Sequence, residues 1–298
     1  MKEPRIAGID LAYAISVFGV IFFSLSVGLT SCESTLSVVS YDLISDTFAA
    51  LFLFLNGIMA SLMMHCEISS RREAKTCLVR KGILFIILGM AASILWPTQI
   101  LVTIGLLLLI SPLLTQVTGS ILRALYVIAI TASILLFSFG ATDGATVVGP
   151  FSLSSAFISS YADYTLVSGY YSLLPWAVFF LSGVLFGRLD FLNPKVRRSS
   201  GFFSWIAIGT GSILQILGGA FFISKSHSKS DLVFPFFYSP EFNIISFILI
   251  ATGLSVLILN LCVKMGETKR RSEPKFFLQK MGSIKYFLYI SHIVYGLV

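Results

Sequence analysis

The sequence has little charge and no long polar stretch. Only 12% of its 298 residues are charged and 56% are hydrophobic, whereas a soluble domain is about 25% charged. This composition excludes an ordinary soluble protein and predicts a polytopic membrane protein. Because no polar segment is long enough to form a separate soluble domain, we expect residues 1–298 to form a single integral-membrane, all-α domain.

Residues for metal, redox or nucleotide chemistry are also scarce. The four cysteines contain no CxxC pair, and the three histidines (His65, His227 and His292) lack metal-ligand spacing. There is no P-loop, and Gly209-Thr-Gly211 lacks the third glycine of a dinucleotide fingerprint. We therefore predict no metal site and no nucleotide-binding loop of either kind.

Positive charge is nearly absent from one side of the predicted membrane. Apolar runs predict about nine spans, near residues 8–29, 43–64, 82–96, 99–115, 121–140, 172–189, 201–223, 243–263 and 284–298. With a cytoplasmic N-terminus, every Lys and Arg except Lys225 and Lys229 falls on the inner side. Since these cations lie in short loops, they indicate membrane topology rather than nucleic-acid binding. We expect contact with the lipid bilayer and no nucleic-acid partner.

Asp10 lies inside the first apolar run, where an ionisable group is costly and marks a functional candidate. On a helix, Asp10, Tyr13 and Ser24 lie within about 60° of one line, which forms a polar stripe through the membrane. Two simpler explanations remain open. Asp10 could lie shallow enough to pair with Arg5 or another loop cation, and Ser24 could bond to its own backbone.

Asp42 and Asp46 are one helical turn apart at the predicted outer end of the second span. Two adjacent carboxylates can perform acid–base chemistry, because their repulsion raises the pKa of one of them. They could equally be solvated acids that favour the positive end of a helix dipole.

Four short stretches carry a family resemblance. They are Arg5…Gly8-Ile-Asp10-Leu-Ala, Leu51-Phe-Leu-Phe-Leu-Asn-Gly57, Leu174-Pro-Trp176 with Gly183-x-x-x-Gly187-Arg188, and Met281-Gly282…Leu288-Tyr-Ile-Ser-His292. In this order they resemble the heparan-α-glucosaminide N-acetyltransferase-like and DUF418 (YeiB-like) membrane proteins of bacteria, which belong to a superfamily of transmembrane acyltransferases.

The resemblance implies transfer of an acetyl group from cytoplasmic acetyl-CoA, as co-substrate, to a sugar or glycan outside the bacterial inner membrane. It implies Asp10 and Ser24 as candidate catalytic residues, and Asp46, one of the two paired carboxylates, is the third candidate. The corresponding candidates for contact with the cofactor are Arg5, Tyr13, Arg71 and Arg72. The three arginines among them lie on the inner side and suit the phosphates of acetyl-CoA.

Two positions depart from the family pattern. Tyr13 stands where an arginine usually follows the aspartate by three residues, and Ser24 stands where an Asn or His is usual. These changes favour, as an alternative, a catalytically degenerate member that serves as a binding, immunity or assembly component. A small-molecule transporter is a third hypothesis. The last apolar run is short, so we expect either a reduced bundle or a helix completed by a partner subunit or a second copy.

Overall fold

The computed structural model describes residues 6–29, 35–65, 71–93, 100–138, 165, 172–225, 240–267, 286 and 288. For residues 23–29, 35–43, 93, 137–138, 218–225 and 240–243 it describes the backbone alone. Within these ranges every regular element is a helix and no strand occurs. The predicted all-α class is confirmed for this part of the chain.

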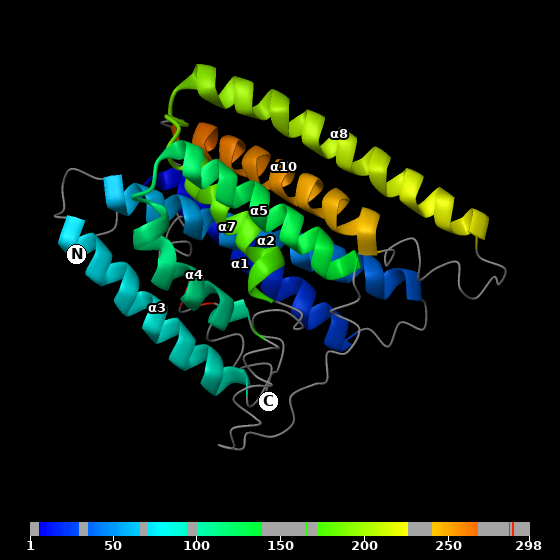
Figure 1. Cartoon of the computed structure of the whole chain (residues 1–298), viewed down its shortest axis with the longest axis horizontal. Helices are drawn as coiled ribbons and strands as arrows, with labels where there is room; N and C mark the ends of the chain where they lie inside the picture. The colour runs from blue at the N-terminus through cyan, green and yellow to red at the C-terminus, as the bar shows by residue number, and fades with distance from the viewer. Residues whose placement is uncertain are drawn as a thin grey trace. The chain divides into compact units, whose positions relative to one another are not determined.

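The helices follow the predicted apolar runs closely. They are α1 (Ala7–Leu29), α2 (Thr35–His65), α3 (Arg71–Ser93), α4 (Ile100–Leu114), α5 (Gly119–Ser138), α7 (Leu173–Phe186), α8 (Pro194–Lys225) and α10 (Pro240–Glu267) (Figure 1). The first eight predicted spans each fall on one of these helices. The ninth, at 284–298, lies outside the described residues except for positions 286 and 288.

Four of the described helical segments are long and apolar enough to cross a membrane. They are Ile44–His65, Gly119–Leu136, Pro194–Leu217 and Ile244–Glu267, and shorter apolar helices occupy Ala7–Phe22, Ile100–Leu114 and Leu173–Phe186. Together they make the chain an integral membrane protein. The count of nine spans and the cytoplasmic N-terminus stay predictions.

Several helices begin earlier than the apolar runs. We expected Arg71, Arg72 and Lys81 in a loop, but all three are helical because α3 starts at Arg71. Asp46 likewise lies three turns into α2 rather than at a helix start. In α3 the physical reason is that Arg, Lys, Glu and Ala are good helix formers, whereas hydropathy detects only the apolar part of a helix.

The contacts group the chain into two compact units. Unit 1 comprises Asn56–Leu189, and unit 2 comprises Arg5–Leu55 with Asp190–Gly296. In unit 1, α3 packs along α4, and α7 packs against α4 and α5. In unit 2, α10 packs against α8 and α1 (Figure 1). The single membrane domain stays an expectation.

Buried hydroxyl groups in both units bond within their own helix. Ser16 donates to the carbonyl of Tyr13 at 2.9 Å, Ser182 to Phe179 at 2.7 Å and Ser255 to Ala251 at 2.7 Å. Such bonds satisfy a polar group where water is excluded. These serines therefore require no ligand to explain them.

Candidate functional site

In unit 2, the first turn of α1 packs closely against the last turns of α10. A Cβ atom added to Gly8 would lie 2.5 Å from Cα of Val263, and one added to Gly266 would lie 2.9 Å from the backbone N of Gly8. Only glycine permits this approach. The contact brings the turn that holds the half-buried Asp10 to the level of Lys264, which directly follows Val263.

Tyr13, one turn beyond Asp10, is completely buried. Its ring meets the ring of Phe52 edge-on, with centroids 5.8 Å apart, and Phe52 meets Tyr286 in the same way at 6.2 Å. The family resemblance leads one to expect an arginine at position 13. The structure has the ring of Tyr13 there instead, packed in an aromatic cluster.

The contacts between α1 and α2 separate the two predicted carboxylates. Tyr13 lies beside Phe52, and Gly19 lies directly against the ring of Phe48, so the helices run antiparallel. With a rise of about 1.5 Å per residue, Asp10 and Asp46 lie about 15 Å apart along the helix axes. They cannot act together on one proton. Ser24 belongs to α1, but its side chain, that of Asp42 and all of Arg5 lie outside the described residues.

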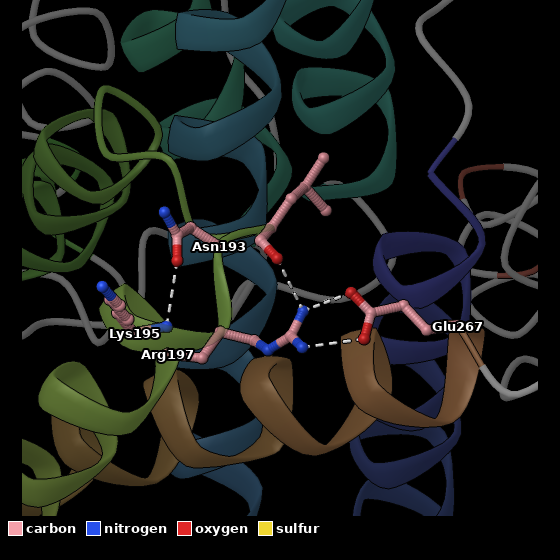
Figure 2. A network of polar contacts seen from close by, with 5 residues as sticks. Asn193, Lys195, Arg197 and Glu267 are labelled. Carbon is pink, nitrogen blue, oxygen red and sulfur yellow. Dashed lines mark hydrogen bonds and ion pairs between the residues drawn. The ribbon is translucent and has the colours of Figure 1, made fainter.

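A polar network joins the start of α8 to the end of α10 in the same unit (Figure 2). Arg197 forms a two-pronged ion pair with Glu267, in which Nη2 lies 2.7 Å from Oε2, and it also donates to the carbonyl of Leu192 at 3.1 Å. Asn193 accepts a bond from the backbone N–H of Lys195 at 3.0 Å and so caps α8. This network fixes α8 on α10 at the end that also contains Gly8.

In unit 1, two of the stretches that carry the resemblance meet each other. A Cβ added to Gly57 of α2 would overlap the carbonyl oxygen of Phe180 in α7, and one added to Gly187 would lie 2.8 Å from Cβ of Ser61. Small residues at such a crossing let membrane helices approach closely. The two glycine motifs are thus the two sides of one helix contact.

Arg188, directly after this contact, binds the end of α4. Its Nη2 donates to the carbonyls of Leu114 and Thr115, both at 3.1 Å, where the helix dipole is negative. The sequence contains the motif but gives no signal for this bond, which joins residues more than seventy positions apart.

Arg71 and Arg72 lie at this same end of unit 1. Gly82 of α3 packs on Gly105 and Leu109 of α4, and continuing this antiparallel register places Arg72 level with the turn after Thr115. Both arginines are exposed. We call Arg71, Arg72 and Arg188 the basic end of unit 1.

The basic end retains hydrogen-bonding capacity. Ser61 Oγ and Arg188 Nε are buried and have no hydrogen-bond partner among the described residues. Cationic guanidinium groups with spare donors suit an anionic, phosphate-bearing ligand. Among the described residues, no group of three or more His, Cys, Asp or Glu side chains could hold a metal ion.

Comparison with known protein families gives a match to most of the chain. The family model described as heparan-alpha-glucosaminide N-acetyltransferase, catalytic, matches residues 5–223. No curated protein and no solved structure matches the chain.

Proposed function

Because the chain belongs to the heparan-alpha-glucosaminide N-acetyltransferase catalytic family, we propose that it transfers an acetyl group from acetyl-CoA to a sugar acceptor. The observation that carries this proposal is the family match over residues 5–223, which covers most of the chain and every predicted site residue. The bacterial inner membrane is the proposed location, with a glycan as acceptor.

The basic end of unit 1 is the proposed site for the phosphates of acetyl-CoA. Arg71 and Arg72 are exposed there and can bind phosphate oxygens directly. Arg188 is occupied by the carbonyls of α4, so its role is to hold α4 against α7 beneath these two arginines. Arg5, which belongs to unit 2, is proposed as a cofactor contact from the family resemblance alone.

Asp10 is the proposed proton acceptor. The amine or hydroxyl of the acceptor attacks the thioester carbonyl, the new N–C or O–C bond forms, and the C–S bond breaks to release the CoA thiolate. Asp10 takes the proton that the acceptor loses, and that proton then passes to the thiolate.

The other candidates have more limited proposed roles. Asp46 lies about 15 Å from Asp10 along the axes, so it serves acceptor binding rather than the same proton transfer. Ser24 is proposed to contact the acceptor near the far end of α1. Tyr13 can contact the donor only if the donor enters beside the aromatic cluster that encloses its ring.

A second function has a specific observation in its favour. Tyr13 is fully buried against Phe52 at the position where the family resemblance leads one to expect an arginine. A member that has lost this cation could retain the fold and bind a donor or partner without catalysis. Assembly with a second copy or another membrane subunit belongs to this alternative.

Acetyl transfer by the purified chain tests the two functions. Wild type, Asp10→Asn and Asp46→Asn are incubated with acetyl-CoA and an amino-sugar acceptor, and release of free CoA thiol is measured. The enzyme proposal expects acceptor-dependent release that Asp10→Asn reduces by about 100-fold or more and Asp46→Asn reduces less. Absence of release in wild type, with recovery in Tyr13→Arg, would establish the degenerate alternative instead.

A further inference from the structure

The outward face of α3 changes from charged to apolar along its length. Arg80, Leu84 and Ile87 lie within about 60° of one line on the helix. All three are exposed, Leu84 at 53% and Ile87 at 59%. The third predicted span, near residues 82–96, lies on α3. On a helix that spans a bilayer an exposed apolar stripe faces lipid, so this prediction puts Arg80 at the beginning of a lipid-facing stripe.

The uncharged part of α3 is too short to cross a bilayer alone. The segment Gly82–Ser93 carries no charge and is about 18 Å long as a helix, whereas the hydrocarbon core is about 30 Å thick. Even the apolar run that extends to residue 96 in the sequence gives only about 22 Å. A bilayer-spanning α3 therefore brings Arg80 to the depth of the lipid phosphates or below it.

The packing of α3 against its neighbour α4 indicates the same depth in the membrane for Arg80. The register set by Gly82 with Gly105 and Leu109 places Arg80 level with residues 107–111 of α4. Leu113, nearer the end of α4, is still 70% exposed. Exposed apolar surface thus continues past the level of Arg80, so a bilayer that covers this surface also reaches Arg80.

We propose that Arg80 binds the phosphate group of an anionic phospholipid. An outward-facing arginine at this depth extends its charged end toward the headgroups and pairs with a phosphate, for which the planar guanidinium is well suited. The acidic residue on the same face is Glu73, two turns nearer the helix start and about 10 Å away, so it leaves the phosphate position open. This inference does not depend on the proposed acetyl transfer.

Native mass spectrometry of the full chain, titrated with phosphatidylglycerol or phosphatidylcholine, tests the inference. Arg80→Gln is expected to bind phosphatidylglycerol about fivefold more weakly than wild type, with binding of phosphatidylcholine unchanged. Arg80→Lys keeps the charge and should keep most of the affinity.

Arg198→Gln is the matched control, because Arg198 is also exposed near a helix start. The uncharged segment after it, residues 199–224, is about 39 Å long, so Arg198 has no need to enter the lipid zone. Its substitution should leave phosphatidylglycerol binding unchanged. Wild-type affinity in Arg80→Gln, an equal loss in Arg198→Gln, or displacement of the lipid by millimolar CoA would each overturn the proposal.

Discussion

Replacing Arg188 by alanine should destabilise unit 1, because it removes both bonds to the end of α4. The guanidinium donates at 3.1 Å to the carbonyls of Leu114 and Thr115. A hydrogen bond from a charged group contributes about 1.5 kcal/mol or more. Since Arg188 is only partly buried, water can replace some of this, and we expect a net loss of about 2 kcal/mol.

Thermal unfolding of the purified protein in detergent measures this loss. A change of about 2 kcal/mol lowers the melting temperature by about 4–8 °C for a domain of this size. Arg188→Lys keeps the charge but not the fork of donors, so it should recover about half of the loss.

Arg123→Ala is the control for general effects of charge removal. Arg123 is exposed, and its Nη2 donates to Oγ of Ser120 in its own helix at 3.4 Å. The Arg123→Ala variant should melt within about 1 °C of wild type, as surface variants usually do. If Arg188→Ala melts at the same temperature as Arg123→Ala, the reasoning about the end of α4 is refuted.

Two further predictions use the same melting assay. Gly57→Ala should destabilise the chain by about 2 kcal/mol because the added Cβ overlaps the backbone of α7. Gly209 has open space around it, so Gly209→Ala should be neutral or stabilising by up to about 1 kcal/mol. A lower melting temperature for Gly209→Ala than for Gly57→Ala would contradict the α2–α7 contact. Arg197→Ala should lower the melting temperature more than Glu267→Ala, because Arg197 also donates to the carbonyl of Leu192; an equal or smaller effect would show that the Leu192 bond contributes nothing.

The helices were predictable because apolar runs are the strongest signal that a membrane protein carries. Each of the first eight runs lies on a helix. The helix ends were less predictable, since hydropathy gives no information about charged residues such as Arg71 that continue a helix beyond its apolar part.

The candidate site was predictable as a set of residue types but not as an arrangement. Asp10 and Tyr13 are apparent in the sequence, but their distance from Asp46 depends on how α1 and α2 pack. The bonds of Arg188 to α4 and the approach of Gly8 to Val263 join residues far apart in the chain. No local pattern encodes such contacts.

Direct binding of acetyl-CoA is the measurement closest to the central claim. Isothermal titration of the purified full chain should show saturable binding, and Arg71→Gln with Arg72→Gln should weaken it by about 10-fold or more, as loss of two charge-assisted contacts requires. Arg198→Gln should bind as wild type does. Absence of binding by wild type at millimolar acetyl-CoA, or equal affinity in the Arg71/Arg72 double variant, would contradict the account.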